Sequence, residues 1–255
     1  MSTDRPIDWH VNEPRGDGFF RWGYSGEELI AEWTGFLTLR ATRGGELIDL
    51  QAAPGATEDL VEKARRGVAT AFLRAQKNQV SLHASAVALG RRAIVCVGSS
   101  GQGKSTMAEA ICRRSGALLL ADDTAGIDAP PGGGIRVLPS ESVVWLVTED
   151  PARKASVPVP RAADAPTDLA LIVSLAFDDA AASLDIRDLH GGDAVAALLP
   201  SLLRFETTPD LWLRELEIVG RLVSACRVVQ ATRSRSVTGD ATAEALLALF
   251  ESETP

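Results

Sequence analysis

The chain has 255 residues, of which 45% are hydrophobic and 24% are charged, and its formal net charge at pH 7 is -8. This composition is that of a globular protein with ample material for a core, which argues against a disordered chain. The negative charge gives no support for a nucleic-acid or membrane partner, whereas an acidic surface would tolerate a basic peptide or protein.

Three cysteines, an odd number, lie far apart in the sequence at Cys96, Cys112 and Cys226. They form no C-x-x-C pair, and the histidines are not spaced as metal ligands, so we expect the cysteines to be small core residues. Segment 1–18 lacks the basic and apolar regions of a secretory signal, and no window reaches about 18 consecutive apolar residues. These features lead us to expect a reduced, cytoplasmic protein.

Residues 1–80 carry the pattern of a small β-meander followed by a helix. Residues 1–18 are polar and contain prolines and glycines, so we expect them to be loose or draped over the surface. Short apolar segments separated by turns predict the strands Phe19–Tyr24, Leu29–Trp33, Phe36–Arg40 and Leu47–Leu50. Apolar residues at helical spacing then predict a helix at Thr57–Lys77 with Thr57 as its cap. We expect Trp22, Trp33 and Phe36 to form the core of the meander rather than a platform for a ligand or for nucleic-acid bases.

A phosphate-binding motif follows the predicted strand Ala93–Val97, which is apolar at every position, as in a central strand covered on both faces. The motif G-x-x-x-x-G-K-[ST], known as Walker A, is matched by Gly98, Ser99, Ser100, Gly101, Gln102, Gly103, Lys104 and Ser105. Its glycines let backbone N–H groups turn toward a polyphosphate, and the start of the next helix adds unpaired N–H groups. The Lys104 ammonium could then reach the β- and γ-phosphate oxygens, and Ser105 could bind Mg²⁺.

Two acidic residues, Asp122 and Asp123, end the next apolar strand. Successive side chains of a strand point to opposite faces, so both can enter one site only if the strand ends or bends there, which Thr124 and Gly126 permit. One carboxylate could hold the magnesium, directly or through water, and the other could accept the proton of an attacking hydroxyl. The alternative is a strand end with solvated acids.

His83 lies in a predicted strand, Ser81–Leu89, that pairs with Ala93–Val97 through the turn at Gly90. A lone histidine in a strand is more often a structural residue. His83 would lie near the opening of a cleft only if its strand neighbours the strand that leads into the motif.

The second half of the chain offers other candidates. Asp178 and Asp179 end the predicted strand Leu169–Phe177, and many P-loop enzymes place the metal-binding acid this far downstream, so this pair competes with Asp122 and Asp123. The proline-rich loop Glu149–Pro166 carries Arg153 and Lys154, which could neutralise a transferring phosphoryl group or simply be solvated.

The remaining sequence predicts three helices and a last strand. The expected elements are helices at Asp193–Leu203, interrupted by Pro200, at Thr208–Ala225 and at Ala241–Phe250, and a strand at Val228–Ala231. The expected buried stripe of the second helix consists of Trp212, Leu216, Val219 and Val223. Arginines flank the last strand at Arg227, Arg233 and Arg235 and could meet a nucleotide or a partner, or form a solvated patch.

The order of these features resembles the catalytic core of the HPr kinase/phosphorylase family. The resemblance is carried by S-L-H-A-S-A-V, a turn at Gly90, G-S-S-G-Q-G-K-S and L-L-A-D-D, within roughly Ser81–Pro139. The family includes small relatives that phosphorylate lasso-type precursor peptides. The resemblance implies an α/β fold with a P-loop kinase core of the HPr kinase/PEP carboxykinase-like type at 81–255, to which 1–80 adds the meander and a packing helix.

Carried over by position, the resemblance implies that Lys104 and Ser105 serve ATP and Mg²⁺, and that Asp122 serves the metal. It implies that Asp123 is the catalytic base and that His83 lies beside the phosphates. The implied reaction is transfer of the γ-phosphoryl group of ATP to a serine hydroxyl of a peptide or small protein, for which a lasso-type precursor is a candidate.

Two features depart from the family pattern. Thr106, which completes the expected cofactor-binding segment, stands where HPr kinases commonly have glutamate, and their second glycine-rich signature has no match. The resemblance therefore gives no support to phosphorylase activity or to HPr as the substrate. Three alternatives stay open: an ATPase or switch that transfers phosphate to water, a non-catalytic nucleotide-binding module, and a small-molecule kinase. Full HPr kinases are hexamers, but this chain has a different and shorter N-terminal part, so a homo-oligomer is an open expectation.

Overall fold

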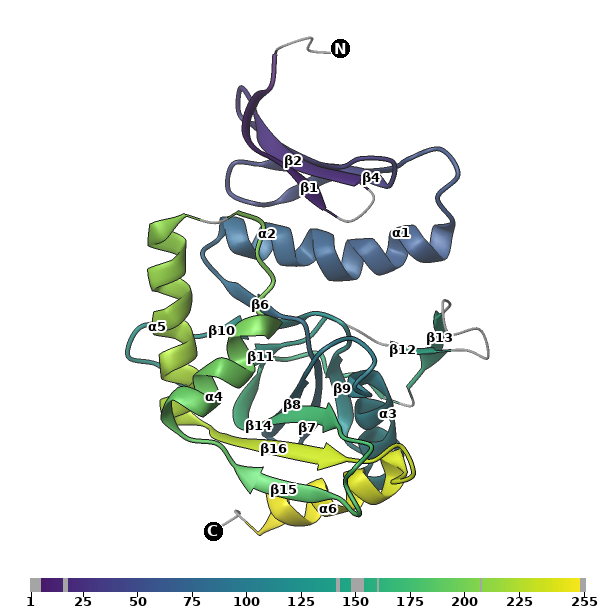
Figure 1. The fold of residues 1–255 in the computed structure, drawn as a ribbon. Helices are drawn as coiled ribbons and strands as arrows, with labels where there is room; N and C mark the ends of the chain where they lie inside the picture. The colour runs from purple at the N-terminus through teal and green to yellow at the C-terminus, as the bar shows by residue number, and fades with distance from the viewer. Residues whose placement is uncertain are drawn as a thin grey trace. The chain divides into compact units, whose positions relative to one another are not determined.

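The computed structural model describes residues 6–15, 18–140, 143–147, 154–159, 161–206 and 208–252. The chain is a mixed α/β protein that forms two compact units (Figure 1). The smaller unit contains Met1–Gln79 and the short segment Arg204–Glu206, and the larger unit contains Val80–Leu203 and Thr207–Pro255.

The smaller unit contains a five-stranded antiparallel sheet. In chain order its strands are β1 (Asp8–Arg15), β2 (Gly18–Ser25), β3 (Glu28–Trp33), β4 (Leu37–Thr42) and β5 (Leu47–Ala52). The expectation that 1–18 is loose is wrong for β1, which pairs with β2. Gly23 of β2 permits this pairing, because a Cβ there would lie 2.1 Å from the carbonyl oxygen of Asp8.

One nearly continuous helical segment follows this sheet. It consists of α1 (Glu58–Ala64), the π-helical turn η1 (Arg65–Ala69) and α2 (Thr70–Gln76). As predicted, Thr57 caps the first helix, and its hydroxyl accepts a hydrogen bond from the Leu60 N–H. The fully buried Phe72 of α2 contacts Phe20, Trp22 and Phe205 at ring-centroid distances of 5.3 to 5.9 Å. These aromatic rings therefore form a core. Of the three residues expected in it, Trp22 is buried, whereas Trp33 and Phe36 are half-buried.

The larger unit has a mixed nine-stranded sheet. Its strands are β6 (Val80–Leu82), β7 (Ser85–Leu89), β8 (Arg92–Val97), β9 (Leu118–Ala121), β10 (Ala125–Asp128), β11 (Arg136–Leu138), β14 (Thr167–Phe177), β15 (Asp185–Asp188) and β16 (Arg227–Arg233). Their order is β6-β10-β11-β14-β8-β7-β9, and β16 pairs with both β14 and β15. A separate two-stranded sheet pairs β12 (Val143–Val147) with β13 (Lys154–Pro158). The strand β13 corrects the expectation that all of 149–166 is a loop.

The prediction of one continuous strand at Ser81–Leu89 is also wrong. The strand is interrupted at His83 and Ala84, because the backbone N–H of His83 donates to the carbonyl oxygen of Ser201 at 2.6 Å instead of continuing the ladder. The first part, β6, pairs with β10, and the second part, β7, pairs with β8.

Helices cover both faces of the larger sheet (Figure 1). On one face lie α3 (Lys104–Ser115) and α6 (Gly239–Glu251), and on the other lie α4 (Gly191–Leu198), the 3-10 turn η2 (Leu199–Ser201) and α5 (Pro209–Ala225). Alternate residues of β8 enter the two cores, with Val95 and Val97 on the side of α4 and Ile94 and Cys96 on the side of α3. This double burial explains why β8 is apolar throughout.

The expected buried stripe of α5 is correct only in part. Val219 is fully buried, but Trp212 and Leu216 are 38% and 41% exposed. Periodicity identified the apolar face of this helix, but only its later turns pack into the core.

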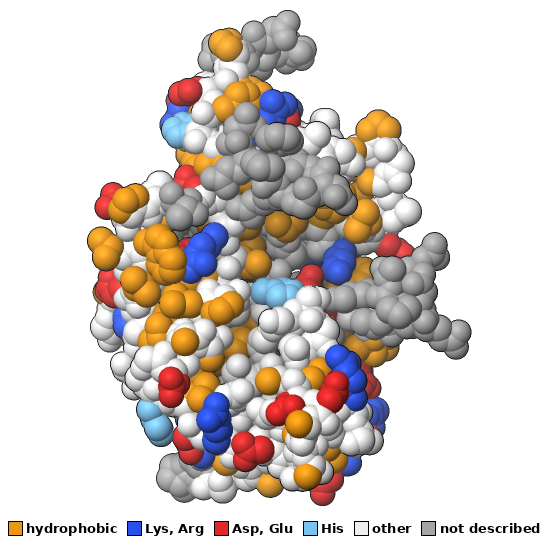
Figure 2. Space-filling view, in the orientation of Figure 1, with side chains coloured by type: hydrophobic (Ala, Val, Ile, Leu, Met, Phe, Trp, Pro, Cys, Tyr) orange, Lys and Arg blue, Asp and Glu red, His pale blue; other side chains and the backbone are white. Residues whose placement is uncertain are grey.

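All three cysteines are free and buried, as expected of small core residues. No helix in the described part of the chain is long and apolar enough to cross a membrane. On the face that Figure 2 shows, acidic and basic side chains are interspersed over the described residues rather than gathered into one basic patch.

Candidate functional site

The strand order places the ends of four strands at one edge of the sheet. Strands β8, β14 and β16 run parallel. Strand β7 is antiparallel to both β8 and β9, so β9 runs in the same direction as β8. The carboxyl ends of β8, β9, β14 and β16 therefore meet at the edge where β7 begins. In open α/β sheets, this is the edge at which ligands bind.

The loop between β8 and α3 depends on glycine at three positions. Gly98, Gly101 and Gly103 have φ values of 141°, 85° and 88°, in the left-handed region that favours glycine. A Cβ on Gly98 would also lie 2.7 Å from the carbonyl oxygen of Leu175 in β14. The loop is tied to the same strand by Gln102, whose Oε1 accepts a hydrogen bond from the Phe177 N–H at 2.6 Å. The sequence motif thus adopts a tight loop held against β14.

Lys104, the first residue of α3, lies over this loop. Its side chain is largely buried, and Nζ donates to the carbonyl oxygens of Gly98 at 2.8 Å and of Ser99 at 3.2 Å. The ammonium group is therefore held at the loop, close to the backbone that a bound anion would contact.

Asp122 is fully buried at the end of β9. Its Oδ1 accepts a hydrogen bond from the Ser85 hydroxyl at 2.5 Å, and its Oδ2 accepts one from the Trp145 N–H at 2.7 Å. Burial raises the pKa of this carboxyl group, and hydrogen bonds from Ser85, Trp145 and Ser105 oppose that shift. The structure thus brings Asp122 to Ser105, the hydroxyl residue of the loop.

Asp123 follows Asp122 with a left-handed backbone, with φ of 69°. This conformation breaks the alternation of the strand, so both acids can serve the same site, as the sequence required. The His83 Nδ1 lies 3.0 Å from the carbonyl oxygen of Asp123 and 3.5 Å from its carboxylate Oδ1. The side chain of Asp123 is 28% exposed and remains accessible.

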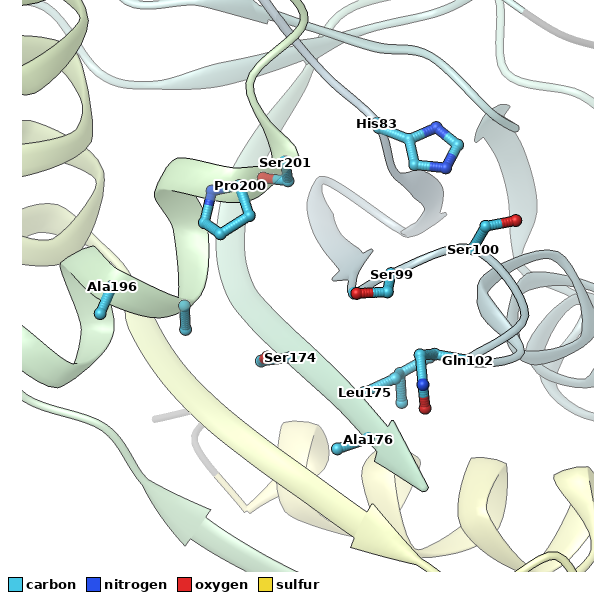
Figure 3. A pocket seen from close by; sticks show the side chains of 12 residues that line it. His83, Ser99, Ser100, Gln102, Ser174, Leu175, Ala176, Ala196, Pro200 and Ser201 are labelled. Atoms are coloured by element: carbon cyan, nitrogen blue, oxygen red, sulfur yellow. The ribbon is translucent and has the colours of Figure 1, made fainter. Parts of the chain in front are cut away.

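Two cavities flank the loop, and every residue of segment 98–106 lines one or both of them. The larger has a volume of about 490 Å³ and is lined by His83, Gly98, Ser99, Ser100, Gln102, Ser174, Leu175, Ala176, Ala196, Ala197, Pro200 and Ser201. Figure 3 shows Ser99 and Ser100 on one side of it and Pro200 and Ala196 on the other. The smaller, of about 100 Å³, is lined by Ser100, Gly101, Gly103, Lys104, Ser105, Thr106, Asp123, Trp145 and Leu146.

The rival acidic pair lies at the same edge of the sheet but lines neither cavity. Asp178 is exposed, and its carboxylate accepts a hydrogen bond from the Ala180 N–H within a turn. Asp179 is 80% exposed, and the guanidinium of Arg235 lies 3.9 Å from its carboxylate. Of the two proposed cations in the proline-rich segment, Arg153 lies outside the described residues, and the side chain of Lys154 is not described.

The sequence interpretation missed three groups at this edge. Ser85 lies two residues after His83, in the same short motif, and its buried position beside β9 was not anticipated. Trp145 donates its backbone N–H to Asp122, a contact that no residue type reveals. Arg233 was noted as one of three arginines near the last strand, but nothing in the sequence distinguished it from the other two.

Comparisons with known proteins add little to this description. A scan against protein-family models finds no match, and a search of the curated proteins finds none either. The solved structures similar to this chain include the HPr(Ser) kinase/phosphatase from Coxiella burnetii, at 12% identity and a TM-score of 0.41, covering 68% of this chain and 97% of that chain. A likeness at this level says nothing about activity or substrate.

Proposed function

We propose that this protein is an ATP- and Mg²⁺-dependent kinase with a P-loop core of the HPr kinase-like type. In this proposal it transfers the γ-phosphoryl group of ATP to a serine hydroxyl of a peptide or small protein. The observation that carries the proposal is that the Lys104 loop, the Ser105–Asp122 pair and the Asp123–His83 pair lie at one edge of the sheet. Enzymes of phosphoryl transfer work mainly by positioning and charge stabilisation, which these groups can supply.

The loop fits the polyphosphate of a nucleotide. The three left-handed glycines carry no side chain, and beyond Gly101 and its chain neighbours no heavy atom lies within 4 Å of the position that a Cβ on Gly101 would take. The Lys104 ammonium donates to two carbonyl oxygens of the loop, those of Gly98 and Ser99. Phosphate oxygens are stronger acceptors for an ammonium group than carbonyl oxygens, so they would recruit this side chain.

The donor set beside the loop fits magnesium. A hydroxyl and a carboxylate are hard oxygen donors, and Mg²⁺ usually keeps several waters when it is bound beside a phosphate. Ser105 would hold the ion. Asp122, which is buried and already accepts hydrogen bonds on both oxygens, would orient Ser105 and an ion-bound water. The ion would neutralise charge on the phosphate oxygens.

Asp123 is the group best placed to act as the base. The oxygen of the serine hydroxyl would form a bond to the γ-phosphorus, while the bond from that phosphorus to the oxygen that bridges the β- and γ-phosphates of ATP breaks. That oxygen would leave with ADP. The serine proton would pass to the carboxylate of Asp123, and Lys104 would stabilise charge on the transferring group. His83 lies 3.5 Å from this carboxylate and can hold it in place.

The larger cavity supports a peptide acceptor. Apart from His83, its lining carries no ionisable side chain, and most of the lining residues are small. A volume of about 490 Å³ admits a short peptide segment around one serine, and a neutral small molecule would also fit. A serine-containing peptide, with a lasso-type precursor as the first candidate, is therefore our proposed substrate.

The test is to incubate the protein with Mg-ATP and serine-containing peptides and to look for a mass gain of one phosphate. We expect Lys104→Ala and Asp123→Asn to lose this product, and Asp178→Asn to retain it. Phosphate release without a phosphorylated acceptor would instead identify an ATPase or switch, and nucleotide binding without turnover would identify a binding module. Loss of activity in Asp178→Asn but not in Asp122→Asn would transfer the metal-binding role to the downstream pair.

A further inference from the structure

Arg233, the last residue of β16, is a buried cation without a counterion in the described part of the chain. Its exposed fraction is 5%, Nη1 donates to the carbonyl oxygen of Val237 at 2.9 Å, and the guanidinium lies over the ring of Phe177 at 4.4 Å. No described Asp or Glu forms an ion pair with it. By contrast, Arg227 at the other end of the same strand pairs with Asp188.

Such an arrangement is unfavourable for a folded protein without a ligand. Transfer of a guanidinium from water into the interior has a large desolvation penalty, which a carbonyl group and an aromatic ring offset only in part. Burial accordingly lowers the pKa of Arg233, although an arginine remains charged at neutral pH. A fixed, desolvated guanidinium is suited to bind an anionic ligand through charge-assisted hydrogen bonds.

The guanidinium is directed at the phosphate-binding loop. Its Nη2 lies 2.8 Å from the position that a Cβ on Gly103 would take, so a side chain at 103 would collide with it. Gly103 is the residue immediately before α3, at the positive end of the helix dipole. Arg233 therefore adds a full positive charge beside the last glycine of the loop.

The strand order puts Arg233 and the acidic pair on opposite sides of the loop. From β8, the sheet continues through β7 to β9, where Asp122 and Asp123 lie, and in the other direction through β14 to β16, where Arg233 lies. A nucleotide whose γ-phosphate faces Asp123 would extend its other end toward β16.

We propose that Arg233 binds the α-phosphate of the nucleotide and thereby fixes the direction in which it lies along the loop. The γ-phosphate then faces Asp123 and His83, and the nucleoside lies on the side of Arg233 and Phe177. This inference rests on the nucleotide-binding part of the proposed function, but not on serine as the acceptor.

Calorimetric titration with ADP and with a non-hydrolysable ATP analogue, both with Mg²⁺, tests the inference. In Arg233→Met and Arg233→Gln we expect the affinity for both nucleotides to fall by a similar factor, about 10- to 100-fold, because both carry the α-phosphate. Arg233→Gln keeps an amide donor for the Val237 carbonyl group and should therefore preserve the fold better than Arg233→Met. Thermal unfolding of both variants without nucleotide checks that they are folded. Arg227→Gln is the matched control and should bind as the wild type does.

Three results would overturn the inference. The first is a folded Arg233 variant that binds ADP as tightly as the wild type. The second is weakened binding of the ATP analogue alone, which would place Arg233 at the γ-phosphate. The third is a wild-type protein that binds neither nucleotide, which would also overturn the proposed function.

If ADP binding depends on Arg233 but no peptide is phosphorylated, only the proposed acceptor fails. If a peptide is phosphorylated but nucleotide binding does not depend on Arg233, the proposed function stands and the role of Arg233 fails.

Discussion

The hydroxyl of Ser85 donates a hydrogen bond of 2.5 Å to the fully buried carboxylate of Asp122. The two residues are far apart in the sequence, but the pairing of β7 with β9 sets Ala86 opposite Ala121, which places their neighbours together. A buried carboxylate needs such donors, because each unsatisfied oxygen carries the full penalty of its desolvation.

We therefore expect Ser85→Ala to lower the free energy of unfolding by about 1 to 3 kcal/mol. It should also weaken Mg²⁺-dependent nucleotide binding, because Asp122 loses part of its support. Ser81→Ala is the matched control: Ser81 is also buried, but its hydroxyl has no partner among the described residues, so its removal should be neutral or stabilising. Urea unfolding of the two variants checks the difference, and equal losses would contradict this account.

The backbone of Asp123 dictates which substitution can test its role. Asparagine adopts the left-handed region at least as readily as aspartate, whereas alanine there costs about 1 to 2 kcal/mol. We expect Asp123→Asn to unfold at the temperature of the wild type and to bind nucleotide normally, yet to lose peptide phosphorylation. Asp123→Ala should lose both activity and stability. Retention of phosphorylation by Asp123→Asn would show that the base lies elsewhere.

Two glycines of the loop should respond differently to the same substitution. In Gly98→Ala the new methyl group would meet the Leu175 carbonyl oxygen at 2.7 Å, and a backbone atom of a central strand cannot move aside easily. In Gly101→Ala the methyl group has no neighbour within 4 Å, so only the left-handed strain of about 1 to 2 kcal/mol remains. Chemical denaturation should show the larger loss of stability for Gly98→Ala, and the reverse order would refute the steric argument.

The parts of the site that the sequence predicted are those encoded locally. The apolar strand β8, the glycine loop and the start of α3 are contiguous, so spacing alone defines them. The local sequence pattern could not decide between Asp122 and Asp178 as the metal-binding acid, because both residues follow strands that end at the same edge of the sheet. Their surroundings differ through the left-handed turn at Asp123 and through donors from β7 and β12, neither of which the local pattern reveals.

The unpredicted features share a non-local cause. The break in the strand at His83 comes from a hydrogen bond to the carbonyl oxygen of Ser201, far along the chain. The strand β1 exists because Gly23 lets it approach β2. Arg233 and Arg227 are the same residue type in one strand, and their different surroundings follow from the end of β16 that each occupies. Tertiary packing decides each of these outcomes, and residue type or periodicity does not report it.

The cysteines of the larger unit provide a prediction that depends on pH. Burial raises the pKa of both Cys96 and Cys112 from an ordinary value of 9.0 to about 12. At pH 8 the native protein should then carry roughly a thousandfold less thiolate at these positions than the unfolded chain, and thiolate is the reactive form. We expect iodoacetamide to label Cys96 and Cys112 quickly in urea and hardly at all without it, as mass spectrometry over time would show. Because the folded state disfavours ionisation, these thiols leave stability unchanged below about pH 9 and reduce it as the pH rises toward 12. Rapid labelling of Cys96 in the native protein would contradict this account, because it would mean that β8 is not buried on both faces. The loop that follows β8 would then lack a rigid support.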